Sequence, residues 1–357
     1  MSAPPIQTAA TTASPVASGT RAPAAGPSDA PIAIDPAIGG ATDDDDQSDA
    51  RSVNTSSTAS LSESITQYRM LHGRTYTQKI EYWGPNDEQQ QEGLELNHYM
   101  LTRFLGDRLF LAPLKDTPQM VLDVGTGTGS WAIDFADEFP SSEVIGVDIS
   151  PIQPSWNPPN CKFQIDDVEQ PWTWPSNEFD YIHIRNLEGA VADWVTLYKE
   201  AFTCLKEDGY IEVKEFDIET RSQVKEFDES HIFKRWIKHL SAACERMGKT
   251  AMQCKGAGIG NNLREAGFVD IVEQKWPIPV GAWAKDPVLK DVGQSALEYL
   301  DRSLDGFGLY LLKEVMGWEY AEVVLFVAEN RKALKDVTLQ PVLYLHVTYA
   351  RKPQASS

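Results

Sequence analysis

Short apolar segments alternate with amphipathic ones through the middle of the chain, from residue 119 to residue 213. The apolar segments predict strands, and the amphipathic ones predict helices with an apolar residue every three or four positions. We expect strands at Met120–Val124, Glu143–Val147, Lys162–Ile165, Phe179–Ile184 and Tyr210–Val213, and helices at Ser130–Phe139 and Trp194–Leu205. Such alternation is typical of an α/β fold, a parallel sheet with helices on both faces.

The flanking segments follow other patterns. Apolar residues near helical spacing predict a helix over 88–112, and Gly209 suits the left-handed residue that follows a helix. Phe268–Lys275 and Val342–Tyr349 are expected to form a closing pair of strands, with mostly helical chain at 290–335 between them.

These patterns divide the chain into three parts. Residues 1–63 are rich in Ala, Pro, Ser, Thr and Asp and have almost no aromatic side chains, so we expect a disordered tail that cannot bury enough apolar surface to fold. Residues 64–118 form an N-terminal cap. Residues 119–353 form the main domain, with a helical lid at about 285–335 whose apolar residues also suit a cover over an apolar substrate.

Composition restricts the function. The 357 residues carry a formal net charge of −20, which disfavours binding to nucleic-acid phosphates. The four cysteines show no pairing or histidine spacing typical of a metal site, so no metal is expected. There is neither a secretory signal pattern nor an apolar run long enough to span a membrane, so we expect a protein of the cytoplasm or the nucleus.

The glycine loop Asp123–Gly129, with sequence DVGTGTG, joins a predicted strand to a predicted helix. Gly125, Gly127 and Gly129 let the backbone turn tightly and approach a ligand, and the N-terminus of the following helix suits an anionic group. A dinucleotide-binding loop would need a glycine at position 130, where this chain has Ser130. With Asp123 ahead of the glycines, the loop favours S-adenosylmethionine (SAM) over NAD, which remains an alternative, as does a turn without a ligand.

Acidic residues follow the next two predicted strands. A carboxylate at Asp148 can accept hydrogen bonds from both ribose hydroxyls of a nucleoside. Asp167 can bind the exocyclic amine of adenine while the backbone N–H of Val168 reads a ring nitrogen. Each aspartate alone is also compatible with a solvated turn, but three acidic positions after three successive strands favour a nucleoside site.

With these motifs the chain resembles the fungal LaeA-like methyltransferases, within the class I SAM-dependent superfamily, over roughly residues 64–353. The resemblance rests on matches distributed along that range: Tyr68-Arg69, His72–Tyr76, Gly84–Glu88, Val121–Gly129, Trp131–Asp134, Val144–Asp148, Pro151–Trp156, Pro158–Cys161, Phe179–Arg185, Ile211–Val213, Pro279–Gly281 and Gly317-Trp318. The chain departs from the family pattern at Thr77, Gly93 and Glu207–Gly209.

The resemblance implies a Rossmann-like fold with a seven-stranded, mostly parallel sheet whose last strand is antiparallel, and a role in fungal secondary metabolism. It also implies SAM as cofactor. The cofactor-binding residues are then expected to be Asp123, Gly125, Thr126, Gly127, Gly129, Asp148, Ile149, Asp167 and Val168. Some family members act instead as nuclear regulators with velvet-type protein partners, and this is the second hypothesis.

The sequence carries the least information about the acceptor of the methyl group. An oxygen or nitrogen of a small molecule is expected, and a proton acceptor can assist its attack. His183 at the end of a predicted strand is the candidate base, although a structural role is the favoured interpretation of this histidine. Further candidates are Arg185, Glu215, His98, Tyr76 and His72. Asn157–Asn160, an NPPN sequence, follows the wrong strand for a nucleobase methyltransferase motif and is interpreted as a turn.

Overall fold

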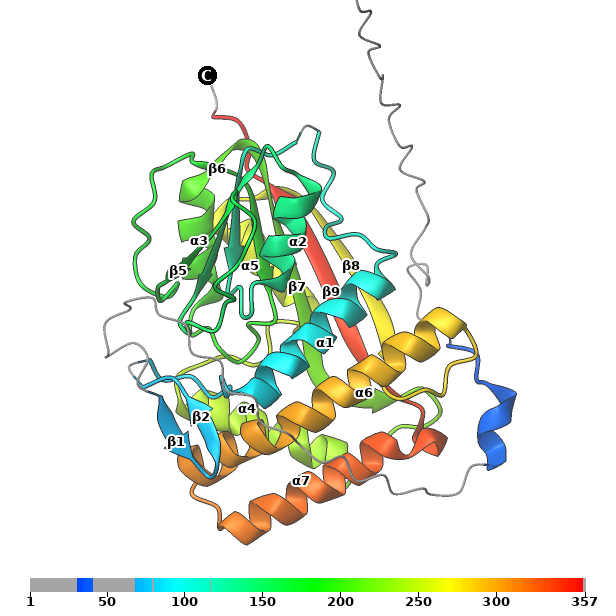
Figure 1. The fold of residues 1–357 in the computed structure, drawn as a ribbon. Coiled ribbons are helices and arrows are strands. Elements are labelled where there is room, and N and C mark those ends of the chain that lie inside the picture. Colours follow the sequence, from blue (N-terminus) through cyan, green and yellow to red (C-terminus); the bar gives the residue numbers. More distant parts are fainter. Residues whose placement is uncertain (1–30, 41–67, 79, 116, 356–357) are drawn as a thin grey trace, which may run out of the picture.

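A seven-stranded sheet forms the centre of the protein in the computed structural model, which describes residues 31–40, 68–78, 80–115 and 117–355 (Figure 1). The order across the sheet is β5-β4-β3-β6-β7-β9-β8. The strands are β3 (Met120–Val124), β4 (Glu143–Asp148), β5 (Cys161–Ile165), β6 (Phe179–Arg185), β7 (Leu205–Ser222), β8 (Val269–Pro279) and β9 (Pro341–Arg351). Strands β3 to β7 pair in parallel, whereas β9 is antiparallel to both of its neighbours. The expected fold class, including the antiparallel last strand, is confirmed.

Helices cover both faces of the sheet because alternate residues of each strand point to opposite sides. On one face, α3 (Trp194–Cys204) and α5 (Gly258–Ala266) pack on Leu122, Ile182 and Ile184. On the other face, α2 (Ser130–Glu138) packs its apolar side on Val121 and Tyr181. Tyr181 and His183 of β6 therefore face α2.

A separate helical layer lies beyond the ends of these strands (Figure 1). It consists of α1 (Glu88–Phe104), α4 (Ile232–Arg246), α6 (Pro287–Gly308) and α7 (Tyr320–Lys335), with a π-helical turn at Leu309–Val315 after α6. Helices α6 and α7 lie between β8 and β9 in the chain, as the pattern at 290–335 predicts. The helical layer shares one apolar cluster with the long strands β7, β8 and β9.

The cap holds a two-stranded hairpin, β1 (Arg69–Leu71) and β2 (Arg74–Tyr76), followed by α1. The predicted helix over 88–112 is wrong over residues 105–112, because α1 ends at Phe104. Gly106 and Asp107 have left-handed φ angles of 70° and 60°, which an α-helix cannot continue. The chain then runs extended over the sheet, where Phe110 packs on Phe135 and Tyr181.

The predicted left-handed glycine after α3 is also wrong. Helix α3 passes directly into β7 at Leu205, and the left-handed residue is Asp208, with φ 62°, rather than Gly209. The end of β9 imposes this turn, because Arg351 binds the Asp208 carboxylate and the Lys352 N–H donates to the Gly209 carbonyl. A Cβ at Gly209 would lie 2.9 Å from the Asp180 carbonyl oxygen.

One part of the expected tail docks on the main body. Around a short 3-10 helix at Pro36–Gly40, Ile34 pairs with Ala284, the Asp35 N–H donates to the Trp283 carbonyl at 3.0 Å, and Lys290 forms an ion pair with Asp35. Ile32 is buried in the apolar cluster of the helical layer. The rest of the expected tail lies outside the described residues.

Candidate active site

A cavity at the carboxyl ends of β3, β4, β5 and β6, here called the strand-end cavity, gathers most of the predicted cofactor residues. It is lined by Gly125, Thr126, Gly127, Asp148, Ile149, Asp167 and Val168. These residues meet because the parallel strands all end at one edge of the sheet, where ligands of open α/β sheets bind. Seven of the nine predicted cofactor residues therefore lie on one cavity wall.

The glycine loop is held in place by the side chains around it. Gly127, at φ 60°, donates its N–H to the Asp148 carboxylate at 2.8 Å, and the second Asp148 oxygen accepts from the Ser150 N–H at 2.9 Å. Burial raises the pKa of Asp148 to about 6, against the opposing effect of these amide donors. A Cβ at Gly127 would approach Leu94 Cδ1 to 3.4 Å, so the loop and α1 leave little room for a side chain.

The other two predicted cofactor residues stand behind the loop and do not line the cavity. Asp123 accepts a hydrogen bond from the Thr126 hydroxyl at 2.6 Å and is nearly fully buried. Gly129 packs so closely against the Phe163 ring that a Cβ at this position would overlap the ring atoms. Both residues shape the loop from its rear side.

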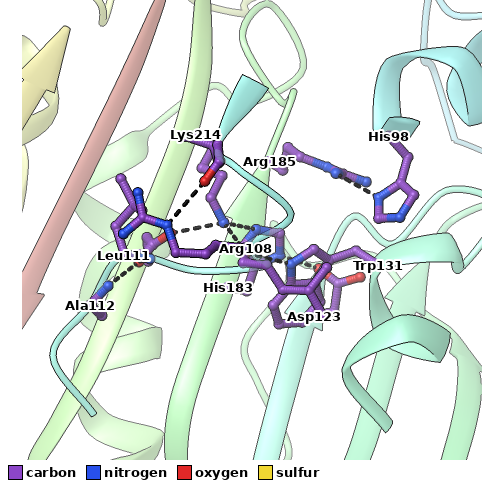
Figure 2. Close-up of polar contacts among 12 residues, drawn as sticks. His98, Arg108, Leu111, Ala112, Asp123, Trp131, His183, Arg185 and Lys214 are labelled. Carbon is purple, nitrogen blue, oxygen red and sulfur yellow. Dashed lines mark hydrogen bonds and ion pairs between the residues drawn. The ribbon is translucent and has the colours of Figure 1, made fainter. Parts of the chain in front are cut away.

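The imidazole of His183 lies in a buried polar network on the α2 face of the sheet (Figure 2). Its Nδ1 is 2.7 Å from the Asp123 carboxylate, its Nε2 is 3.1 Å from Lys214 Nζ, and its ring stacks on Trp131. Burial and then the Lys214 charge hold the pKa of His183 well below its usual value, so the ring is neutral at pH 7. His183 is fully buried and does not line the strand-end cavity, so a base role there has no geometric support.

The network continues to the extended segment after α1. Lys214 donates to the Leu109 carbonyl at 2.7 Å and pairs with Glu212 at 2.8 Å. Glu212 in turn accepts the N–H groups of Leu111 and Ala112 at 2.8 and 2.6 Å. Buried charges are tolerated when they are paired and hydrogen-bonded, and this chain of contacts fastens the cap connection to the sheet beneath the glycine loop.

Helix α1 supplies a wall of the strand-end cavity that the sequence analysis does not assign. Gln90, Leu94 and Asn97 line the cavity from successive turns of the helix. The α1 N-terminus is fixed by Asp87, which caps Gln90 N–H at 3.1 Å and binds Arg74 through both carboxylate oxygens at 2.6 and 2.8 Å. The available signal was the spacing of Gln90 and Asn97 on the apolar side of the helix, at positions where polar residues are unexpected.

Several polar groups of this wall lack partners among the described residues. They are Gln90 Oε1, Asn97 Nδ2, Asn86 Nδ2 and Asn186 Oδ1, all buried side-chain atoms of cavity-lining residues. Buried polar atoms are normally hydrogen-bonded, so a cluster of orphaned donors and acceptors around one cavity indicates a polar ligand. The cavity thus offers a ligand both hydrogen-bond donors and hydrogen-bond acceptors.

Arg185, at the end of β6, contributes a cation to the same wall. Its Nη1 contacts His98 Nδ1 at 3.1 Å (Figure 2). His98 Nε2 lies 2.9 Å from the Asp134 carboxylate. Within the described parts of the chain, no carboxylate lies within 4.0 Å of the Arg185 guanidinium. Burial lowers the pKa of Arg185, which nevertheless stays charged, so the guanidinium favours an anion in the cavity.

The remaining candidate bases lie in different places. Tyr76 is fully buried and donates to the Gly306 carbonyl at 2.9 Å, and His72 pairs with Glu314 at the surface, so neither faces the cavity. Glu215 lines a second cavity, here called the inner chamber, beneath α4, α6 and α7. The described residues contain no cluster of metal-binding side chains and no helix long and apolar enough to cross a membrane.

The two cavities adjoin, since Trp83, Asn186, Tyr299 and Phe307 line both. Trp83 is locked between them by its indole N–H, which donates to the Gly189 carbonyl at 2.8 Å, and by edge-on packing against Phe307. The strand-end cavity and the inner chamber therefore offer adjoining space for two ligands.

Fold and site define a class I methyltransferase, and the comparisons with known proteins place it more closely. A family model described as a methyltransferase domain matches residues 96–272. Methyltransferase pytC of Aspergillus terreus is 36% identical over 309 residues, which cover 85% of this chain and 94% of the relative. The chain belongs to the LaeA-like family of SAM-dependent methyltransferases.

Other relatives carry a different name. The secondary metabolism regulator LAE1 of Cochliobolus heterostrophus is 32% identical over 76% of this chain and 90% of its own length. The regulator laeA of Aspergillus fumigatus is also 32% identical, over 80% of this chain and 77% of its own. Among solved structures, phosphoethanolamine N-methyltransferase 2 of Haemonchus contortus in complex with S-adenosyl-L-methionine is 17% identical with a TM-score of 0.44, over 78% of this chain and 62% of that one.

Proposed function

We propose that the protein binds SAM in the strand-end cavity and transfers its methyl group to an oxygen or nitrogen of a small molecule in fungal secondary metabolism. The observation that carries the proposal is the meeting of Gly125, Gly127, Asp148 and Asp167 on one cavity wall. Bound SAM supplies a methyl group on a positively charged sulfur. The protein then has to hold the donor and align an acceptor with it, and positioning alone can provide much of the rate.

For the nucleoside end, we assign Asp148 to the ribose and the Asp167–Val168 turn to adenine. Asp148 keeps lone pairs free beside its two amide donors, so it can still accept ribose hydroxyls. The Val168 N–H donates no hydrogen bond within the described residues, which leaves it available to a ring nitrogen. Gly125, Thr126, Gly127 and Ile149 complete this wall, and Asp123 and Gly129 support the loop from behind.

For the amino-acid end, we assign the polar wall of α1 and β6. The Arg185 guanidinium and the free Asn97 amide N–H suit the carboxylate, while Gln90 Oε1 and Asn186 Oδ1 suit the ammonium group. This assignment gives each of these orphaned buried atoms a partner. It differs from binding of the carboxylate at the α2 N-terminus, because the Gly127 and Gly129 N–H groups already donate to Asp148 and Thr126.

Methyl transfer is tested by incubating the purified protein with labelled SAM and the intermediates of the gene cluster that encodes it. Transfer to one intermediate supports the proposal, whereas SAM binding without transfer to any of them contradicts it. Calorimetry with SAM and with NAD tests the cofactor separately. NAD binding without SAM binding would overturn the assignment of the cavity.

A second candidate is a nuclear regulator of secondary metabolism that acts with a velvet-type partner, because several relatives are named as regulators. Gene deletion followed by metabolite profiling distinguishes the two. An enzyme of one pathway loses one methyl group from one product, whereas a regulator silences many pathways at once. The enzyme hypothesis goes with a cytoplasmic location, and the regulator hypothesis goes with a nuclear one.

A further inference from the structure

The inner chamber has an almost wholly apolar wall. Its apolar side chains come from α4, α6, the π-helical turn, α7 and the sheet: Phe216, Ile218, Trp236, Leu240, Leu300, Leu304, Phe307, Leu311, Leu334 and Leu343. Helices α4, α6 and α7 and the sheet thus enclose the inner chamber between them. An apolar space of this kind favours a ligand with an apolar body.

Two carboxyl groups among the polar groups that line the chamber give it spare hydrogen-bond acceptors. Glu188 and Glu215, here called the acidic pair, are both buried. The N–H groups of Leu187 and Glu188 donate to Glu215 at 2.8 and 3.0 Å, and the Gln253 N–H donates to Glu188 at 2.9 Å. These donors position the carboxyl groups, and each oxygen retains a lone pair.

One amide oxygen adds to this surplus. Asn330 Oδ1 is buried and has no partner among the described residues, and Asn330 is only 3% exposed. The residue lines the chamber. Since an unpaired buried acceptor costs about 1–3 kcal/mol, this atom favours a ligand that donates hydrogen bonds.

The charges around the chamber also favour a ligand that donates hydrogen bonds. Among the described residues that line it, none is lysine or arginine. Burial raises the pKa of Glu188 to about 7 and holds that of Glu215 well above its usual value. The lining therefore supplies no cation to balance the charge of a buried carboxylate ligand, whereas a neutral alcohol needs none and Glu188 can balance the charge of an amine.

From this surplus of acceptors and lack of cations in an apolar space, we infer that the inner chamber binds the methyl acceptor, and that the acceptor is an apolar alcohol or amine, not a carboxylic acid. The inference rests on the proposed function. The accepting group would enter at the shared wall of Trp83, Asn186, Tyr299 and Phe307, next to the strand-end cavity. Its apolar body would lie among the leucines of α6.

The chemistry balances without a further reactant. The oxygen or nitrogen lone pair of the acceptor forms a bond to the methyl carbon as the carbon–sulfur bond breaks, and that electron pair stays on sulfur. The acceptor loses one proton, which passes to the acidic pair. A carboxyl group with a pKa of about 7, such as Glu188, can both take up and release a proton at neutral pH.

The inference is tested with octylamine, 1-octanol and octanoate, which share one apolar chain and differ in the head group. Each is added to the full-length protein saturated with S-adenosylhomocysteine, and the melting temperature is measured. Octylamine and octanol are expected to raise it by roughly 2–4 °C at saturation, and octanoate to leave it unchanged. An equal shift with octanoate, or no shift with any of the three, overturns the inference.

A variant shows whether the probes occupy the chamber. Leu304→Trp fills it and is expected to abolish the shift, while Leu325→Trp, at a site on α7 that is 71% exposed, keeps it. Where Leu304→Trp does not fold, Cys244→Met fills the same space by a smaller amount. Shifts that persist in the filled variants place the probes elsewhere and contradict the inference. S-adenosylhomocysteine affinity is measured in the same samples, so loss of the cofactor site is distinguished from failure of the chamber.

Discussion

The imidazole of His183 lies flat on the indole of Trp131, with ring centroids 3.8 Å apart and planes 13° from parallel. Asp123 and Lys214 occupy its two nitrogens, which fits the tautomer that carries its proton on Nδ1. Both ring nitrogens and one face of the ring are therefore in use. We interpret His183 as the residue that ties the glycine loop to the interior, which is the structural alternative for this position.

His183→Ala is therefore expected to lower the free energy of unfolding by about 3–5 kcal/mol, since it removes a stacked ring and takes one hydrogen-bond partner from each of two buried charged groups, Asp123 and Lys214. Urea unfolding monitored by fluorescence measures this change. His72→Ala, at a partly exposed histidine, serves as the control and should change stability by less than about 1 kcal/mol. A stable His183→Ala protein that binds SAM but transfers no methyl group would instead support a catalytic base.

Gly127→Val is expected to abolish SAM binding, because the side chain would occupy the cavity beside Leu94 and strain a left-handed backbone. Isothermal titration calorimetry measures the affinity. Gly248→Val is the matched control, since Gly248 also has a left-handed φ of 74°, but a Cβ there would have no described atom within 4 Å. The control should lose stability and keep its affinity for SAM, and unchanged affinity in Gly127→Val would refute the placement of the cofactor.

Arg185→Gln is expected to weaken SAM binding by about 10- to 100-fold, the loss that accompanies removal of one hydrogen bond between charged groups. Binding of 5′-methylthioadenosine, which lacks the amino-acid end, should change little. The ratio of the two affinities is the measurement, and Arg185→Lys should recover part of the loss. If the affinities for both ligands fall equally, Arg185 supports the cavity wall and does not bind the carboxylate of SAM.

The affinity for SAM is expected to fall by about tenfold between pH 7 and pH 5, because the pKa of Asp148 is raised to about 6 and only the ionised carboxylate accepts both ribose hydroxyls. The folding contribution has the opposite sign. A carboxyl group whose pKa is raised on folding stabilises the protein below its unfolded value of 3.8, and this contribution is lost as the pH rises through about 6.

Calorimetry from pH 5 to pH 8 tests this dependence. Asp148→Asn should bind SAM weakly, with an affinity that no longer changes over this range through position 148. A steep dependence that persists in Asp148→Asn would assign the titration to another group, such as the buried Asp123, whose pKa burial also raises to about 6.

The local sequence predicts the parts of this protein whose form depends on neighbours in the chain. The strands β3 to β6 and the glycine loop are legible because strand period and turn chemistry are local properties. The end of α1 at Phe104 also has a local sign, the left-handed Gly106 two residues later, although the apolar spacing continues past it. The turn at Asp208 is decided by Arg351 and Lys352 from the far end of the chain.

The same division applies to the site. Asp148 and Asp167 can be placed from their positions after strands. Gln90 and Asn97 leave only one local sign, polar residues on the apolar side of α1, because their place at the cavity depends on α1 lying across the strand ends. The inner chamber is the extreme case: leucines on α6 have the same spacing whether they fill a core or line a space.

The docked segment around Ile34 and Asp35 makes part of the N-terminal region an anchor on the main body. Asp35 holds this segment to the main body through a backbone hydrogen bond to Trp283 and an ion pair with Lys290. Deletions that stop before Pro31 and those that continue past Gly40 are therefore different experiments, because only the second releases the anchor and uncovers the edge at Trp283.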